Sequence, residues 1–114
     1  MMKENSTCAQ LNNEQDLAQT LKVNNKVIAL FYISWCPFCS LFLPVFKKQA
    51  EGKERNFLLV QDDEQTIGNK YSVRIFPTVL FFEQGVLSQR LDGAAGAGLQ
   101  EEQLVEFINS CSLT

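Results

Sequence analysis

The fold of this chain is decided by Trp35-Cys36-Pro37-Phe38-Cys39 and by the apolar run that precedes it, Val27-Ile28-Ala29-Leu30-Phe31-Tyr32-Ile33. An apolar run of this length predicts a buried strand. Pro37 favours the first turn of a helix, where the N–H that proline lacks is not needed. Two cysteines separated by two residues, at the point where a strand gives way to a helix, are typical of a dithiol redox site.

The position of the pair matters as much as its spacing. A helix N-terminus carries partial positive charge and free N–H groups, which stabilise a thiolate, and the thiolate is the form of cysteine that attacks disulfides. We therefore predict Cys36 and Cys39 as catalytic residues. A zinc site is the alternative, but zinc takes four ligands. Because the chain has no histidine, only the distant Cys8 and Cys111 remain to complete such a set, and we predict no metal.

Composition excludes several other classes of function. The 114 residues predict one domain, 1–114, with 46% hydrophobic and 20% charged residues and a net charge of −3. No stretch is strongly basic, so we expect no nucleic-acid partner. The apolar runs are too short to span a bilayer, so we expect no membrane partner. The polar N-terminus lacks the apolar region of a secretory signal, which favours a cytoplasmic location; a chain whose signal has been removed is the alternative. Nothing in the sequence indicates more than a monomer.

Periodicity and turn signals predict alternating strands and helices. The predicted strands cover residues 7–11, 27–33, 57–60, 78–82 and 86–91. The first predicted helix begins at residue 12 or 13 and runs through Leu17 and Leu21. Three further helices are predicted over residues 37–50, 64–71 and 99–110. The order βαβαβαββα implies parallel pairing of the early strands and an antiparallel final pair. The predicted fold class is α/β, a mixed sheet of about five strands with helices on both faces.

Several single residues carry further expectations. Pro44 lies inside the predicted helix 37–50 and should kink it. Cys111 ends an apolar helical stripe and is predicted to be a core residue. Cys8 lies in or before an edge strand. Two alternatives remain for it, a disulfide with Cys111 and an exposed, reactive thiol. The acidic residues Asp62-Asp63-Glu64 are predicted to form a solvated loop and helix start.

Taken together, these motifs resemble the thioredoxin family over nearly the whole chain. Phe31-Tyr32 followed by Trp35-Cys36-x-x-Cys39 is similar to that family's active-site segment, and Pro44 matches its helix kink. Lys70-Tyr71-Ser72-Val73-Arg74-Ile75-Phe76-Pro77-Thr78, with Phe81-Phe82 and Gly85 after it, is similar to the segment that carries the cis-proline. Gly93 matches the glycine of the last loop near the site.

The resemblance implies a thioredoxin fold and a division of labour between the two thiols. Cys36, exposed at the helix N-terminus, would attack a protein disulfide, and the buried Cys39 would resolve the resulting mixed disulfide. Pro77 would face the pair through a cis bond, and the backbone of Phe76 would pair with an extended substrate segment. A flat apolar contact surface would comprise Trp35, Pro37, Phe38, Phe76, Pro77 and Gly93. No bound cofactor is implied, and a reductase or glutathione would supply electrons.

Two departures from the family pattern stand out. The family's buried aspartate, six residues before the first cysteine, is replaced by Leu30, and the lysine near it by Leu58. Proton transfer from Cys39 would then use water or another group, which predicts slower resolution near neutral pH. The intervening Pro37-Phe38 is similar to the Pro-Tyr of glutaredoxin, so we predict a couple less reducing than that of thioredoxin, about −270 mV.

The predicted function is therefore that of a thiol–disulfide oxidoreductase, an enzyme acting on protein disulfides through Cys36 and Cys39. One alternative is a peptide-binding, chaperone-like module with weak redox activity, which the loss of the aspartate and lysine favours. A glutaredoxin-like, glutathione-linked reductant is a further alternative, although glutaredoxin's Thr-Val-Pro pattern is absent.

Overall fold

A computed structural model describes residues 8–113 as strands and helices in alternation. The strands are β1 (Ala9–Leu11), β2 (Lys26–Tyr32), β3 (Phe57–Gln61), β4 (Thr78–Glu83) and β5 (Val86–Asp92). The α-helices are α1 (Glu14–Val23), α2 (Pro37–Ala50) and α3 (Glu101–Ser110), and two short 3₁₀ turns are η1 (Glu54–Asn56) and η2 (Gly68–Tyr71). Each predicted strand and three of the four predicted helices are present.

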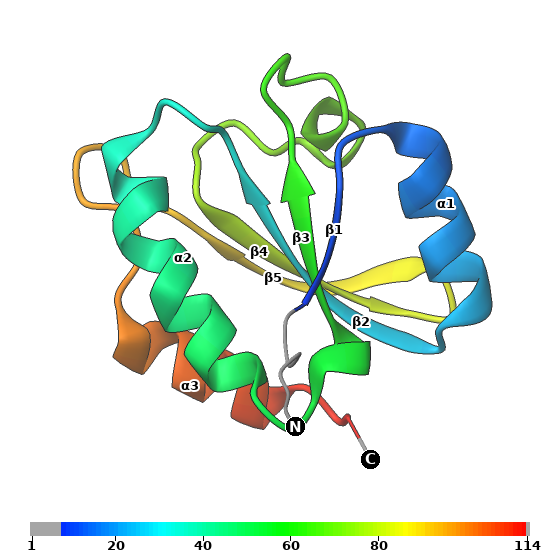
Figure 1. Ribbon diagram of the computed structural model, residues 1–114. Coiled ribbons are helices and arrows are strands. Elements are labelled where there is room, and N and C mark those ends of the chain that lie inside the picture. Colours follow the sequence, from blue (N-terminus) through cyan, green and yellow to red (C-terminus); the bar gives the residue numbers. More distant parts are fainter. Residues whose placement is uncertain (1–7, 114) are drawn as a thin grey trace, which may run out of the picture.

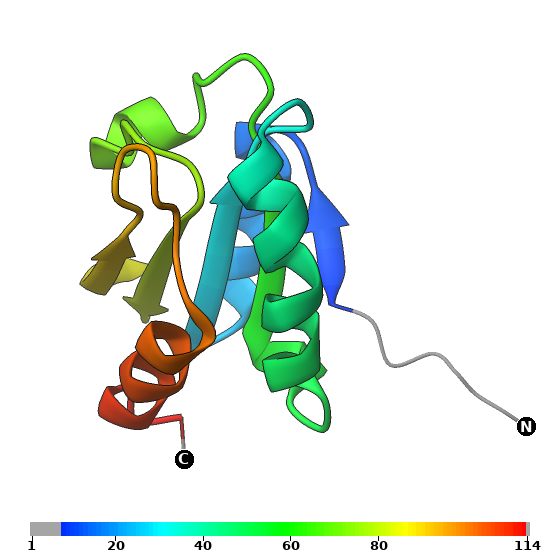
Figure 2. The ribbon, with the colours of Figure 1, turned by 90° about the vertical axis from the view of Figure 1, so that its left-hand side faces the viewer.

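The five strands form one mixed sheet in the order β1-β3-β2-β4-β5. Strand β3 pairs in parallel with both β1 and β2, whereas β4 pairs antiparallel with β2 and with β5. Helix α1 covers one face of the sheet, and α2 and α3 cover the other, as Figure 1 shows. Figure 2, turned by a quarter, shows the C-terminal ends of β2 and β3 leading into the loops beside the start of α2. The predicted fold class is confirmed.

Burial on both faces explains why the central strands are almost entirely apolar. Every residue of β2 after Lys26, and every residue of β3 before Gln61, is buried. Strands covered by helices on both sides have no solvent face and therefore lose the alternation of a half-exposed strand. Strand β5 lies at the edge and is only partly buried, as its mixed polarity predicts.

The helix ends follow from local chemistry. The Asn13 side chain accepts a hydrogen bond from the Asp16 backbone N–H at 2.8 Å, so Asn13 is the N-cap of α1. Helix α3 begins two residues later than predicted, because Gln100 and Gln103 form a reciprocal capping box there. Pro44 lies inside α2, as expected from the sequence.

The predicted helix 64–71 is wrong, and only the 3₁₀ turn Gly68–Tyr71 forms. The buried Asp62 carboxylate accepts hydrogen bonds from the backbone N–H groups of Ile67, at 3.0 Å, and Gly68, at 2.7 Å. These donors fix a loop in place of a helical turn, and Gln65 has a φ of 59°, which no α-helix contains. The first strand is also shorter than predicted, and Thr7 lies outside the described residues.

Within residues 8–113, no helix is both long and apolar enough to cross a membrane.

Candidate active site

The two predicted catalytic cysteines lie where β2 leads into α2. Cys36 is the N-cap of α2, and its sulfur accepts the backbone N–H of Cys39 at 3.4 Å. Pro37 occupies the first turn of the helix, as predicted. Cys36 is half-buried, so its sulfur is less exposed than the resemblance implied, and it lies 3.6 Å from the carbonyl oxygen of Phe76.

Cys39 lies one turn into α2 and is 1% exposed. Burial is the main cause that raises the pKa of its thiol to about 12, and the neighbouring Cys36 sulfur adds to it, while the backbone N–H of Ile33 acts in the opposite direction. At neutral pH the Cys39 thiol is therefore protonated. The two sulfurs thus differ in accessibility, as a two-step exchange needs.

A hydrogen-bonded carboxylate holds the segment that precedes the dithiol. Asp63 accepts the Ser34 backbone N–H at 2.8 Å, the Ser34 hydroxyl at 2.9 Å and the Gln61 side-chain amide at 2.8 Å. The Gln61 amide, followed by the Ser34 N–H, lowers the pKa of Asp63, so it stays ionised. The sequence alone predicts only a solvated loop at Asp63. Its position directly after the end of β3, next to the end of β2, is the signal that could have found it.

Pro77 and Gly93 lie on the other side of the thiols. The Phe76–Pro77 peptide bond is cis. A Cβ atom on Gly93 would lie 2.3 Å from the Pro77 carbonyl oxygen, so only glycine can occupy this position. The Gly93 N–H donates to the Thr78 hydroxyl at 3.3 Å, and that hydroxyl donates to the Ile75 carbonyl at 2.6 Å. These bonds fix the loop after β5 against the start of β4.

The predicted apolar contact surface is only partly present. Trp35 is 60% exposed and Pro37 is exposed, but Pro77 and Gly93 are buried and the Phe76 side chain is 9% exposed. The Phe76 ring is therefore not part of an exposed apolar surface.

Two further side chains change the expected surface. The half-buried Phe38 contacts Gly98 rather than facing solvent freely. Leu41 is 71% exposed, and sequence reasoning missed it. Leu41 falls outside the buried stripe of α2, which is the signal that could have revealed it. That stripe comprises Cys39, Phe42, Phe46 and Ala50.

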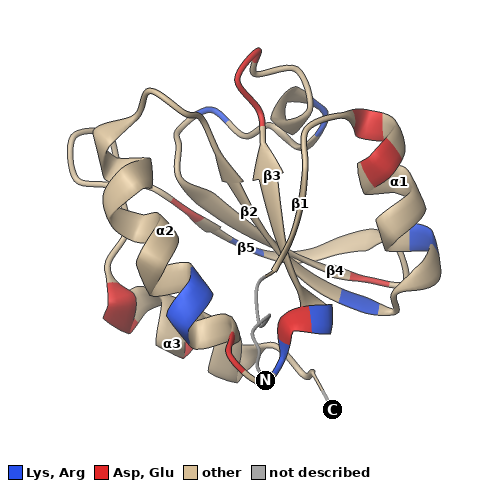
Figure 3. Ribbon diagram, in the orientation of Figure 1, with Lys and Arg blue, Asp and Glu red and all other residues tan. Residues whose placement is uncertain are grey.

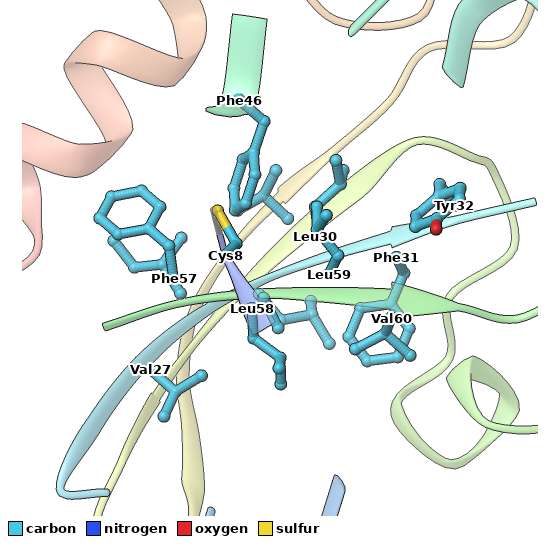
Figure 4. Close-up of a cluster of buried hydrophobic side chains, with 14 of the residues drawn as sticks. Cys8, Val27, Leu30, Phe31, Tyr32, Phe46, Phe57, Leu58, Leu59 and Val60 are labelled. Carbon is cyan, nitrogen blue, oxygen red and sulfur yellow. The ribbon is translucent and has the colours of Figure 1, made fainter. Parts of the chain in front are cut away.

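The position of the missing aspartate is fully apolar. Leu30 is 0% exposed, and strand register places Leu59, not Leu58, beside it. Leu58 pairs with Ala29 and so points to the opposite face of the sheet. Figure 4 shows Leu30 and Leu59 on the side of β3 that faces Phe46. Leu58, which the resemblance sets at the family's lysine position, therefore lies next to Ala29 rather than next to Leu30.

The remaining cysteines are core residues. Cys8 is 7% exposed and Cys111 is 6% exposed, and both thiols are free. Burial raises the pKa of both thiols, that of Cys111 to about 11. The expected burial of Cys111 is confirmed, and an exposed, reactive Cys8 is contradicted. Within residues 8–113, no three Cys, Asp or Glu side chains gather closely enough to hold a metal ion.

Comparison with known proteins agrees with this geometry. The thioredoxin family model matches residues 7–110. A thioredoxin from Mycoplasmoides gallisepticum is 34% identical over 85 residues, which are 73% of this chain and 85% of that protein. A protein disulfide-isomerase A5 from Bos taurus is 30% identical over 106 residues, 88% of this chain but only 20% of that protein. A thioredoxin mutant structure from Halobacterium salinarum superposes with a TM-score of 0.74 at 27% identity, covering 95% of both chains.

Fold and site together define a dithiol–disulfide oxidoreductase. The chain belongs to the thioredoxin family. The family relationship favours the oxidoreductase over both the binding module and the glutaredoxin-like reductant.

Proposed function

We propose that Cys36 is the attacking thiol of this oxidoreductase and that Cys39 is the resolving thiol. The observation that carries the proposal is the asymmetry of the pair. Cys36 accepts an N–H at the start of α2 and is half-buried, whereas Cys39 is buried and has a pKa raised to about 12. An accessible sulfur at a helix N-terminus favours the first attack, and a protected sulfur favours the second.

The exchange has two balanced steps. The Cys36 thiolate attacks a protein disulfide, so a bond forms between Cys36 and one substrate sulfur while the substrate disulfide breaks and releases a thiolate. Cys39 then loses its proton and attacks the Cys36 sulfur, which forms the Cys36–Cys39 disulfide and releases the second substrate thiolate. The substrate gains two electrons and the chain loses two. A partner reductase or glutathione returns the pair to its dithiol form.

Substrate binding is proposed for the residues around the pair. An extended substrate segment would lie along the backbone of Phe76 and Pro77, where the Phe76 carbonyl oxygen lies 3.6 Å from the Cys36 sulfur. Trp35 and Pro37 would supply apolar side-chain contacts. Phe38 and Gly93 would bound the same region from α2 and from the loop after β5.

The physiological setting is also part of the proposal. A single domain, 1–114, acting as a monomer in the cytoplasm would work as a reductant, because cytosolic thiols are held reduced. No cofactor is required for the exchange itself.

Equilibration against glutathione buffers, followed by thiol trapping and mass spectrometry, tests the proposal. We expect a reversible two-electron couple confined to Cys36 and Cys39, less reducing than about −270 mV. Cys39→Ser should accumulate a mixed disulfide at Cys36, whereas Cys36→Ser should form none. Cys111→Ala, which removes a buried thiol away from the pair, serves as the control and should exchange normally.

A stoichiometric bound metal, or a couple that survives Cys36→Ser, would contradict the assignment. A strongly reducing value would keep the thiol roles and the reductase direction but refute the predicted potential. A strongly oxidising value would indicate disulfide formation or isomerisation in place of reduction.

A further inference from the structure

The loop between β5 and α3, residues 93–98, lies beside the N-terminal end of α2 (Figure 1, orange loop). Backbone hydrogen bonds close it on itself. The Ala94 N–H donates to the Gly98 carbonyl at 3.1 Å, and the Gly98 N–H donates back to Ala94 at 2.8 Å. The Ala97 N–H also donates to Ala94, at 3.0 Å. The loop is therefore a small closed unit rather than a loose connection.

One end of this loop is fixed to the cis-proline segment. Gly93 lies so close to Pro77 that a Cβ atom would meet the Pro77 carbonyl oxygen at 2.3 Å. The other end is fixed to the dithiol turn. A Cβ atom on the buried Gly98 would lie 2.9 Å from the Phe38 Cβ and 3.1 Å from the Phe38 Cγ and Cδ1. Phe38 thus rests against the backbone of the loop with no space between them.

These contacts connect both sides of the thiol pair through the loop. On one side, the Cys36 sulfur lies 3.6 Å from the Phe76 carbonyl, and Pro77 follows Phe76. On the other side, Phe38 stands between the two cysteines in the sequence. Because Phe38 is held from outside α2, the first turn of the helix is held as well.

From this arrangement we infer that loop 93–98 positions the dithiol turn, and that Phe38 and Gly98 are the positioning residues through which it acts. The inference rests on the proposed roles of Cys36 and Cys39. It concerns the second step, in which Cys39 attacks the Cys36 sulfur, the Cys36–Cys39 bond forms, and the substrate thiolate leaves. Loss of the contact would let the first turn of α2 move, and small misplacement of reacting atoms slows a reaction steeply.

Two glycines in this loop provide a matched pair for the test. Gly98 has a φ of +68° and meets Phe38, whereas Gly96 has a φ of +75° and a Cβ atom there would have nothing within 4 Å. Alanine at either position bears the same kind of backbone strain. Only Gly98→Ala also pushes against Phe38, so the difference between the two variants reports the contact alone.

The experiment makes two measurements. The lifetime of the mixed disulfide is measured by rapid acid quench after the protein is mixed with a peptide disulfide. The thiol–disulfide equilibrium of the pair is measured against glutathione. Gly98→Ala and Phe38→Ala should each lengthen that lifetime about tenfold and disfavour the Cys36–Cys39 disulfide. Gly96→Ala should match the unmodified chain in both, and Phe38→Tyr, which keeps the ring, should retain most of the rate. The double variant Gly98→Ala/Phe38→Ala should be no slower than the slower single variant, because the methyl group added by Gly98→Ala acts against the ring that Phe38→Ala removes.

Equal lifetimes for Gly98→Ala and Gly96→Ala would overturn the inference. If Gly98→Ala does not fold, an unchanged lifetime in Phe38→Ala overturns it independently. An unmodified chain without a reversible couple at Cys36 and Cys39 would instead refute the proposed function, and the inference with it.

Discussion

At the scale of single residues, the two thiols of the pair are distinguished by burial rather than by sequence. Cys36 and Cys39 are separated by two residues, yet the first caps α2 and the second is buried one turn into the same helix. Burial disfavours the charged form of a thiol, so the resolving sulfur is protonated over the ordinary pH range. We therefore expect proton loss from Cys39 to limit the exchange, because position 30 offers no carboxylate to accept that proton.

This protonation predicts a steep pH dependence of the resolving step. The pKa of Cys39 is raised to about 12, so its thiolate fraction grows about tenfold for each pH unit below that value. Release of a substrate thiol from the mixed disulfide should therefore accelerate from pH 7 to pH 9 without a plateau. Stopped-flow measurement of that release in single turnover checks the prediction. A plateau below pH 9 would mean that another group takes the proton.

A second prediction at this scale concerns the stability of a variant at Leu30. Leu30→Asp places an unpaired carboxyl at a 0% exposed position, and we expect it to lower the free energy of unfolding by about 3 to 5 kcal/mol. Burial raises the pKa of a carboxyl above its unfolded value, so the variant should be closest to the unmodified chain below about pH 4 and lose stability as the pH rises.

Urea unfolding of the Leu30→Asp variant at pH 4 and pH 8 measures the effect. Leu30→Asn, which cannot ionise, is the control and should show no such added pH dependence. A loss of stability equal at both pH values would contradict a buried, titrating carboxyl.

At the scale of elements, the loop after β3 shows how one buried side chain replaces a helix. The Asp62 carboxylate binds two backbone N–H groups and is 2% exposed. The sequence between Glu64 and Tyr71 has helix-forming residues, but the side chain of Asp62 satisfies donors that a helix would otherwise use. Directly after it, Asp63 holds Ser34 and thereby the segment leading to Cys36.

Asp62 therefore makes a measurable contribution to stability. Asp62→Ala leaves the buried N–H groups of Ile67 and Gly68 without acceptors, which should lower the free energy of unfolding by about 2 to 3 kcal/mol. Asp62→Asn keeps one acceptor oxygen, so its loss should be smaller. Denaturant titration of both variants gives the comparison, with the exposed Gln65→Ala variant as a control for surface substitution in the same loop. Equal losses for Ala and Asn would contradict the hydrogen-bonding account.

At the scale of the whole molecule, two segments beside the thiols carry no charge. Helix α2 has no charged residue before Lys47, and the chain from Gly93 to Gln100 has none at all. Figure 3 shows this part of α2 and the neighbouring loop without Lys, Arg, Asp or Glu. Exposed Trp35 and Leu41 lie at this end. Docking here is expected to depend on apolar contact more than on steering by charge.

Two exposed aliphatic residues, one on α2 and one on β5, test this expectation. Leu41 is 71% exposed on α2, and Val86 is 67% exposed at the start of β5. Val86 pairs with Glu83 of β4, which in turn pairs with Lys26 at the start of β2. Leu41→Glu should raise the KM for an apolar peptide disulfide roughly tenfold, equivalent to about 1.4 kcal/mol of binding. Val86→Glu adds the same charge far from the thiols and should leave KM unchanged. Similar KM values for the two variants would place the docking surface elsewhere.

The sequence by itself determined the sheet, its mixed pairing and the identity of the reactive pair. Hydrophobic runs such as Val27–Ile33 are long enough to specify buried strands, and the Cys36-x-x-Cys39 spacing with Pro37 specifies a helix start. The apolar runs, the helix start and the cysteine spacing are local signals, so they can be derived without knowing what packs against them.

Only the tertiary structure decided which residues surround the thiols. Asp63 contacts Ser34 across 29 positions, and Gly98 contacts Phe38 across 60. The Asp62 hydrogen bonds that replace the predicted helix, the burial of the Phe76 ring and the pairing of Leu30 with Leu59 likewise depend on how strands and loops meet in space. Contacts between distant segments depend on sheet register and close packing, which no local pattern of residues encodes.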